Sequence, residues 1–236
     1  MASEVGHNKN VANFKSLFQI LDEMGPLYNP ANPSITLAEL EPIKTVLDNV
    51  IEEFNAKNPL YKNAVALRQT NTKPLSKLTT RIINAFRASE ASQANIENLE
   101  SMARVIRGMR SKKINPEKES SEGISTSRMS FDNRTANFDA LISFLEANPN
   151  YQPNEIDIQI PALKQFNLMQ KEQNANVNQT ANQLLTAREA RNKALYNDIN
   201  GVVILVPKIK NYLKSLGESG KPYYKQIIRL KFSNKK

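Results

Sequence analysis

The chain has 236 residues, of which 40% are hydrophobic, so it is long enough for one large or two small domains with a hydrophobic core. It contains no cysteine, which excludes disulfides, thiolate nucleophiles and cysteine-bound metals. The formal net charge is +9, and its excess falls in residues 188–236, which hold 12 basic and 3 acidic side chains.

The N-terminal region predicts a short tail followed by one helix. Residues 1–8 read as a flexible tail, without the charged and apolar regions of a signal peptide. Apolar residues then recur at helical spacing over about residues 10–24. The longest apolar run, residues 202–207, is far shorter than the roughly 20 residues of a membrane-spanning helix. We therefore expect a cytoplasmic protein without a transmembrane segment.

The stretch over residues 37–88 carries the most regular pattern of the chain. Its apolar residues alternate at steps of three and four, as in the heptads of a coiled coil. Pro59 and Pro74 interrupt the stretch chemically, but neither shifts the phase. Two interpretations stay open. One is a single helix kinked at the prolines, which the unbroken phase favours, and the other is two helices that turn near Pro59. A shorter helix is predicted over residues 93–107.

The chain then repeats itself after a linker. Residues 108–130 are charged, rich in serine and nearly free of apolar side chains, which predicts a polar, flexible linker. Beyond it, Ala12-Asn-Phe14 returns as Ala136-Asn-Phe138 and Tyr28-Asn-Pro30 as Tyr151-Gln-Pro153, with an offset of 123 to 124 residues that grows to 127 later. The predicted domains are a tail (1–8), helical repeat 1 (9–107), the linker (108–130), helical repeat 2 (131–232) and a basic tail (233–236).

The second long helix is predicted from about residue 161 to residue 216, with two irregular places. Its middle, over residues 170–183, is rich in Asn and Gln. This section is either exposed to solvent, or it forms a polar seam that sets the register between paired helices. Asn200-Gly201 and Pro207 mark a bend or a break. A last short helix follows over residues 222–230.

Together these patterns predict an all-α fold. We expect an elongated helical bundle of two tandem repeats, each with a short helix, a long helix and a second short helix. The two long helices would pack side by side and relate the repeats by pseudo-twofold symmetry.

The sequence offers no catalytic constellation. His7 is the only histidine, and it falls in the predicted tail, which disfavours both a catalytic triad and a histidine metal site. Neighbouring carboxylates such as Glu52 and Glu53 fall on the solvent face of the predicted helix. Glycine-rich phosphate loops are absent. We therefore expect a protein that is not an enzyme, with no catalytic residue, no metal site and no cofactor.

Two sets of basic residues are candidate sites. The first set is a basic segment with interleaved aromatic residues near the C-terminus, which suits a polyanion such as nucleic acid unless its aromatic side chains lie in the core. It comprises Lys208, Lys210, Lys214, Lys221, Lys225, Arg229 and Lys231. The second set is Arg68 and Arg191, which take matching places on the two long helices. Each either reaches water from a narrow seam or forms a buried charge that sets register.

Four segments resemble a family of uncharacterised bacterial hypothetical proteins. They are Ser3-Glu-Val-Gly-His-Asn-Lys-Asn-Val-Ala-Asn-Phe14, Tyr28-Asn-Pro30, Thr80-Arg-Ile-Ile-Asn-Ala85 and Ala187-Arg-Glu-Ala-Arg-Asn-Lys193. The resemblance implies a bacterial origin and a shared helical design, but no active site, cofactor or functional residue.

The sequence therefore favours a structural or protein-interaction role. We expect a scaffold, adaptor or self-assembling protein whose partner is another protein or a second copy of the chain. The alternative is a protein that binds nucleic acid through the basic C-terminal segment. A third hypothesis, a membrane-active amphipathic protein, is disfavoured because the apolar stripes are narrow.

Overall fold

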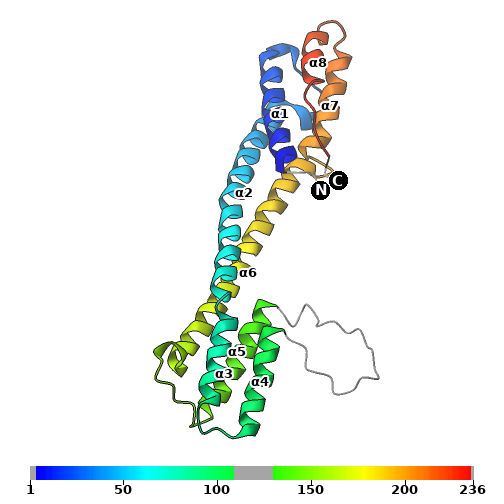
Figure 1. Ribbon diagram of the computed structural model, residues 1–236. Coiled ribbons are helices and arrows are strands. Elements are labelled where there is room, and N and C mark those ends of the chain that lie inside the picture. Colours follow the sequence, from blue (N-terminus) through cyan, green and yellow to red (C-terminus); the bar gives the residue numbers. More distant parts are fainter. Residues whose placement is uncertain (1–3, 109–129, 235–236) are drawn as a thin grey trace, which may run out of the picture. The chain divides into compact units, whose positions relative to one another are not determined.

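The computed structural model describes residues 4–108 and 130–234 (Figure 1). The regular elements in these two ranges are all helices, which confirms the prediction of an all-α fold for the described residues. The predicted linker, residues 108–130, falls almost entirely outside them, as does the end of the predicted basic tail. No helix in the described ranges has both the length and the apolar character needed to cross a membrane.

Contacts between residues divide the chain into two compact units. The first unit joins residues 1–61 to residues 181–236, and the second unit consists of residues 62–180. This division differs from the predicted division into two repeats, because each unit takes residues from both of the predicted repeats. The boundaries of the two repeats stay a prediction, and the compact units describe how the chain packs.

The first unit combines the two ends of the chain. Its N-terminal part holds α1 (Glu4–Glu23), the short 3-10 helices η1 (Gly25–Leu27) and η2 (Pro33–Ile35), and the beginning of α2 (Leu37–Thr72). Its C-terminal part holds the end of α6 (Ile160–Tyr196), then α7 (Val202–Ser215) and α8 (Lys221–Ile227). Helix α8 packs against both α1 and α7, and α7 also packs against η2 (Figure 1).

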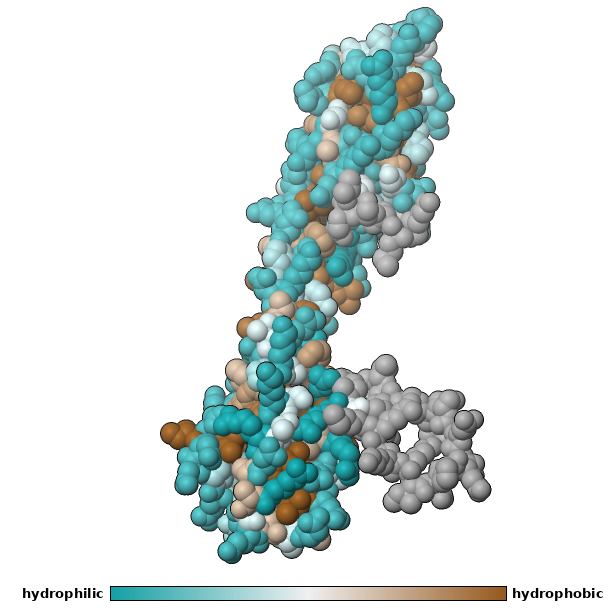
Figure 2. All heavy atoms as spheres, viewed as in Figure 1, coloured by the Kyte–Doolittle hydropathy of each residue, from teal (hydrophilic) through white to brown (hydrophobic). Residues whose placement is uncertain are grey.

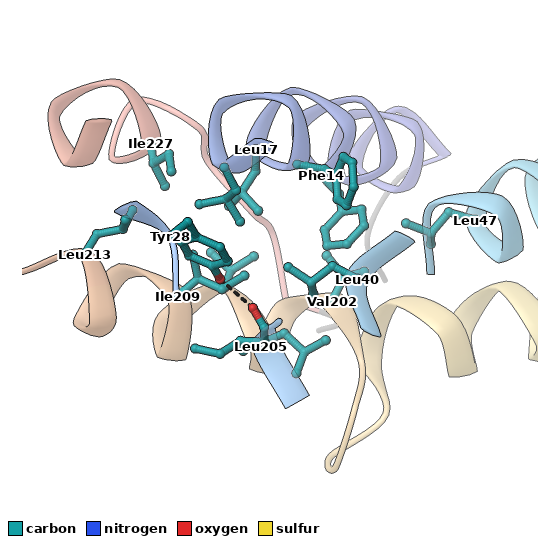
Figure 3. Close-up of a cluster of buried hydrophobic side chains, with 14 of the residues drawn as sticks. Phe14, Leu17, Tyr28, Leu40, Leu47, Val202, Leu205, Ile209, Leu213 and Ile227 are labelled. Carbon is teal, nitrogen blue, oxygen red and sulfur yellow. Dashed lines mark hydrogen bonds between the residues drawn. The ribbon is translucent and has the colours of Figure 1, made fainter. Parts of the chain in front are cut away.

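The core of the first unit lies between these helices. Side chains from α1, α2, α7 and α8 pack together around Tyr28, as Figure 3 shows. The labelled apolar residues are Phe14, Leu17, Leu40, Leu47, Val202, Leu205, Ile209, Leu213 and Ile227. Tyr28 is buried, and its hydroxyl donates a hydrogen bond of 2.5 Å to the backbone oxygen of Ile35. This bond ties the loop after α1 to η2, immediately before α2 begins.

The second unit is built from the middle of the chain. It contains the end of α2, followed by α3 (Leu75–Arg87) and α4 (Gln93–Arg107). It also contains α5 (Phe131–Glu146), the 3-10 helix η4 (Ile156–Ile158) and the beginning of α6. Helix α4 packs against both α3 and α5, and α3 also packs against η4.

The second unit has its own apolar core. Its members come from α3, α4, α5, α6 and the loop before η4, and they include Leu75, Ile82, Phe86, Leu99, Ala103, Ile106, Phe138, Leu141, Leu145, Tyr151 and Leu163. The hydroxyl of Tyr151 donates a hydrogen bond of 2.7 Å to the backbone oxygen of Ile158. On the visible face of the molecule, hydrophobic side chains show between hydrophilic ones (Figure 2).

Prolines affect the long helices in different ways. Helix α2 continues through Pro42 and Pro59 and ends at Thr72, so the prediction of one helix through Pro74 is wrong. A helix-interior proline removes one backbone hydrogen bond, which α2 tolerates at Pro59. At Pro74 the chain instead begins a new helix, in which the amide of Leu78 donates to the Pro74 carbonyl at 2.9 Å.

The predicted helix over residues 161–216 is also divided. Helix α6 ends at Tyr196, and five residues separate it from α7. The Asn197 side chain accepts hydrogen bonds from the amides of Ile199 and Asn200 at 2.9 and 3.2 Å, which closes a local turn. A Cβ on Gly201 would lie 2.4 Å from the Asn197 nitrogen, so only glycine fits this turn without a shift. Pro207 lies inside α7 without ending it.

Helix α1 begins earlier than its sequence pattern predicts. It starts at Glu4, within the segment that reads as a tail, and not near residue 10. His7 is only 4% exposed, because its ring packs edge-on against Tyr196 with centroids 5.6 Å apart. This contact with a distant part of the sequence orders a segment whose local composition gives no such signal.

The polar middle of α6 is buried on one side only. Gln170, Asn174 and Thr180 are 3–9% exposed, whereas Asn176, Asn178 and Asn182 are exposed, so the interpretation of an exposed section holds for one side of the helix and not for the other. The Gln170 side chain accepts from the Thr72 hydroxyl at 2.7 Å and donates to the Asn71 carbonyl at 2.8 Å. The Gln170 amide thus lies against the end of α2, and a polar seam that sets register stays a prediction.

Candidate functional site

The basic residues singled out in the sequence lie together in the first unit, on α7, on α8 and just after α8. We call them the basic surface, which comprises Lys208, Lys210, Lys214, Lys221, Lys225, Arg229 and Lys231. Lys208 and Lys210 are half-buried, and the other five are exposed. The structure therefore brings them onto one helical hairpin and its continuation.

The charge of the basic surface is largely uncompensated. Lys221 forms an ion pair of 3.0 Å with Glu218, the one acidic residue between α7 and α8. The other six basic side chains form no ion pair with a described residue. Burial, and to a smaller degree the charge of Lys231, lowers the pKa of Lys210, whose Nζ donates a hydrogen bond of 3.5 Å to the Leu230 carbonyl.

The aromatic residues of this region face the core. Tyr212, Tyr223, Tyr224 and Phe232 are half-buried and pack against the apolar cluster of the first unit. Tyr212 also accepts a hydrogen bond from the Asn29 amide at 2.9 Å, and its ring meets Tyr28 edge-on. Lys214 lies over the Tyr224 ring at 5.3 Å, which occupies one face of that ring. These rings therefore contribute to the packing of the core of the first unit.

Arg68 and Arg191 both lie against aromatic rings. The guanidinium carbon of Arg68 is 4.1 Å from the ring centroid of Phe131, within the second unit. That of Arg191 is 4.5 Å from the Phe54 ring, within the first unit. Arg191 is only 3% exposed, so it does not reach water, whereas Arg68 is half-buried. Their proposed role in setting register stays a prediction.

The single histidine takes part in a hydrogen-bonded group and does not join an acidic cluster. Its Nδ1 lies 2.8 Å from the Tyr196 hydroxyl, which accepts a hydrogen bond from the Asn10 side chain at 3.2 Å. Among the residues that the structure describes, no group of three or more His, Asp or Glu side chains is placed to hold a metal ion.

A cavity in the second unit gathers basic residues that sequence reasoning does not connect. It has a volume of about 250 Å³, and three of its lining residues are Lys73, Arg107 and Arg134. We call it the cationic cavity. These residues are spread over more than 60 positions of the chain, so no local motif marks them. The predicted repeat offers one signal, because in it Arg134 would take the place of Asn10.

No protein family, curated protein or solved structure matches the chain. The resemblance to bacterial hypothetical proteins therefore stays a prediction, and the function rests on the geometry of the molecule.

Proposed function

We propose that this protein is a non-enzymatic interaction module and that its basic surface binds an acidic protein partner. The observation that carries this proposal is the uncompensated charge of α7 and α8. Six basic side chains lack an ion pair with any described residue, while the intervening rings pack into the core. Charge arranged in this way increases the rate and the specificity of association with a surface of opposite sign.

An acidic protein suits this surface better than single-stranded nucleic acid does. Proteins that bind single strands stack the bases on exposed aromatic rings, and the rings here are half-buried against the core. Ile228 is a large apolar side chain with 38% exposure, and it lies between Lys225 and Arg229 in the sequence. An apolar residue within a charged rim is typical of protein interfaces.

We further propose that the module arose by duplication of a helical segment. Under the repeat, α1, η2, α3 and α4 correspond to α5, η4, α7 and α8. The contacts of the second unit, α3 with α4, α4 with α5 and α3 with η4, then correspond to those of the first, α7 with α8, α8 with α1 and α7 with η2. The pseudo-twofold symmetry and the elongated bundle stay predictions.

The buried tyrosines support the duplication at the level of single atoms. Tyr28 donates to a carbonyl seven residues later, and Tyr151, which lies 123 positions further on, does the same. Each bond closes the loop before the start of a long helix. We propose that each compact unit consists of one half of each repeat. The reason is that each long helix begins in one unit and ends in the other.

Affinity capture with charge-reversed variants tests the interaction. The full chain, immobilised, is incubated with a nuclease-treated extract of the cells that produce it, at about 150 mM salt. We expect an acidic protein to be retained by the wild type and lost with the double variant Lys225→Glu/Arg229→Glu. The matched control is Lys62→Glu/Lys77→Glu, which makes the same charge change at exposed positions of the second unit.

Two outcomes contradict the proposal. One is that all three proteins retain the same set, and the other is that the control loses the partner as fully as the charge-reversed surface does. Light scattering on the purified chain shows whether the acidic partner is a second copy. Self-association that disappears with Lys225→Glu/Arg229→Glu would identify it as such.

Duplex nucleic acid is the second candidate partner. Its backbone is bound through phosphate contacts alone, which needs no stacked bases, so the packed rings do not argue against it. It predicts an affinity for duplex DNA that falls steeply between about 50 and 200 mM salt. Equal binding by the wild type and Lys225→Glu/Arg229→Glu in a mobility-shift assay removes this candidate.

A further inference from the structure

We infer that the cationic cavity of the second unit binds the phosphate group of a small molecule. The cavity lies where four helices end or begin. The end of α2 contributes Gln69 and Thr72, and Lys73 follows it directly. The start of α3 contributes Leu75 and Ser76. The end of α4 contributes Ile106 and Arg107, and the start of α5 contributes Phe131 and Arg134. This site is distinct from the basic surface and does not depend on it.

The charge of the cavity is positive and uncompensated. No carboxylate is among the lining residues, and Lys73, Arg107 and Arg134 form no ion pair with a described residue. By contrast, Arg81 and Arg87 on α3 each hold a carboxylate, from Asp157 and Glu100. Like charges that converge without an acidic partner destabilise the folded chain unless an anion binds between them.

The Arg107 side chain is held in place by a hydrogen bond, and the Nε donors of Arg107 and Arg134 are not used. The Nη2 atom of Arg107 donates to the Thr80 hydroxyl at 2.6 Å, which fixes the end of that side chain. The Nε atoms of Arg107 and Arg134 are buried without a hydrogen-bond partner among the described residues. Because these Nε atoms are buried, a ligand in the cavity would be held by the Nη donors of the two guanidinium groups.

Side-chain charge, and not the helix dipoles, gives the cavity its preference for anions. Two helices begin at the cavity and two end near it, so their partial charges of opposite sign roughly cancel. Arg68 adds a further cation near the cavity, because its guanidinium lies 4.1 Å from the ring centroid of the lining residue Phe131. Guanidinium groups match the oxygens of phosphate with paired hydrogen bonds, which makes a phosphate group the best chemical fit.

The corresponding place in the first unit is filled by the protein itself. Under the proposed duplication, on which this comparison rests, Asn10 corresponds to Arg134 and Tyr196 to Lys73. Asn10 donates to the Tyr196 hydroxyl at 3.2 Å and exchanges two hydrogen bonds of 2.9 Å with the backbone of Ser233. The C-terminal segment thus satisfies the polar groups of that position, whereas in the second unit three cations line a cavity.

The size of the cavity limits the ligand. Its volume of about 250 Å³ is below the usual range for cofactors and drug-sized ligands, which starts near 300 Å³. Leu75, Ile106 and Phe131 supply an apolar wall beside the charged residues. The part of the ligand that the cavity holds is therefore a diphosphate or a phosphate monoester with a small organic part.

Calorimetric titration of the full chain tests the inference. The probes are sodium pyrophosphate and inorganic phosphate, with sodium chloride at matched ionic strength as the reference. We expect saturable binding of pyrophosphate with one site per chain, and a melting temperature that rises with pyrophosphate concentration. The absence of saturable heat up to about 5 mM, where even a millimolar Kd would be detected, would overturn the inference.

Matched variants locate the site. Arg107→Gln/Arg134→Gln should weaken pyrophosphate binding by about tenfold or more, because charge-assisted hydrogen bonds are lost. Lys225→Gln/Arg229→Gln removes the same charge from the basic surface and should change the Kd less than about twofold. Equal weakening by the two double variants, or none by the first, would show that the anion is bound elsewhere. Failure here leaves the capture experiment on the basic surface unaffected.

A folding control accompanies these titrations. Without anion, Arg107→Gln/Arg134→Gln should melt at or above the temperature of the wild type, because like-charge repulsion is removed. If this variant does not fold, the Kd for pyrophosphate is measured instead with Lys73→Gln, which changes an exposed side chain. A weaker Kd for that variant supports the site, and an unchanged Kd overturns it.

Discussion

The two buried tyrosine hydroxyls give the most direct test of the packing. Tyr28→Phe and Tyr151→Phe each remove one hydroxyl and leave the carbonyl of Ile35 or Ile158 without its donor. Ile35 and Ile158 are 2% and 3% exposed, so water does not replace the lost hydroxyl. Burial raises the pKa of both tyrosines, so the hydroxyls are protonated donors throughout the neutral range.

The expected cost follows from the unsatisfied carbonyl. Leaving a buried acceptor without a partner costs about 1–3 kcal/mol, so each variant should lose that much unfolding free energy. The two tyrosines lie in different compact units with no shared contact, so the double variant should show the sum of the two losses.

Urea denaturation followed by circular dichroism measures these losses. Because the chain has two compact units, each curve is fitted for one or two transitions, and a variant should shift the transition of its own unit. A loss below about 0.3 kcal/mol for either variant would refute the reasoning, since it is smaller than the least cost of an unpaired buried acceptor.

Three further predictions concern other contacts. Arg191→Ala should cost about 2–4 kcal/mol of unfolding free energy and Arg68→Ala less, because the Arg191 side chain is 3% exposed and that of Arg68 is half-buried. Equal losses of unfolding free energy in urea denaturation would contradict this prediction. The hydrogen bond from Lys171 lowers the pKa of Asp139, so this carboxylate contributes stability above its unfolded pKa of about 3.9 that is lost as pH falls through the lower folded value. Asp139→Asn should therefore be less stable than the wild type at neutral pH by roughly a few tenths of a kcal/mol, with the difference vanishing by about pH 2 in thermal melts, and a difference that persists there would contradict it. Gly201→Ala should lower the unfolding free energy by roughly 1–3 kcal/mol, because the added Cβ would lie 2.4 Å from a backbone nitrogen, and an unchanged urea midpoint would show that the turn relaxes.

Sequence reasoning succeeded where the apolar pattern alone determines the outcome. The heptad phase predicts the buried positions Leu40 and Leu47, and both are fully buried. The same phase does not reveal helix breaks, because it records which residues face a core and not whether the backbone is continuous. Leu75 and Ile82 stay in phase beyond Pro74, since α3 packs its own apolar face into a core.

Contacts that are distant in sequence account for most of what was missed. His7 and Asn10 are ordered by Tyr196 and Ser233, more than 180 residues away, so the local composition suggests a tail where a helix forms. The buried amide of Gln170 depends in the same way on its position opposite Thr72, which the sequence around Gln170 does not show. Burial of a polar residue is a tertiary property.

The two candidate sites differ in how far the sequence reveals them. The basic surface is visible as a dense run of Lys and Arg, although only the structure shows that Tyr212 and Tyr224 pack inward. The cationic cavity depends on the ends of four helices, whose residues are far apart in the chain. Sequence periodicity contains no information on which helix ends meet.

The central claim, that the basic surface binds an acidic protein, is tested most directly by lysine footprinting of the captured complex. Acetylation of each lysine is measured by mass spectrometry in the free chain and in the complex. The account predicts that Lys214 and Lys225 become protected, while Lys62 and Lys77 in the second unit react as before. Protection of Lys62 and Lys77 with Lys214 and Lys225 still reactive would contradict it.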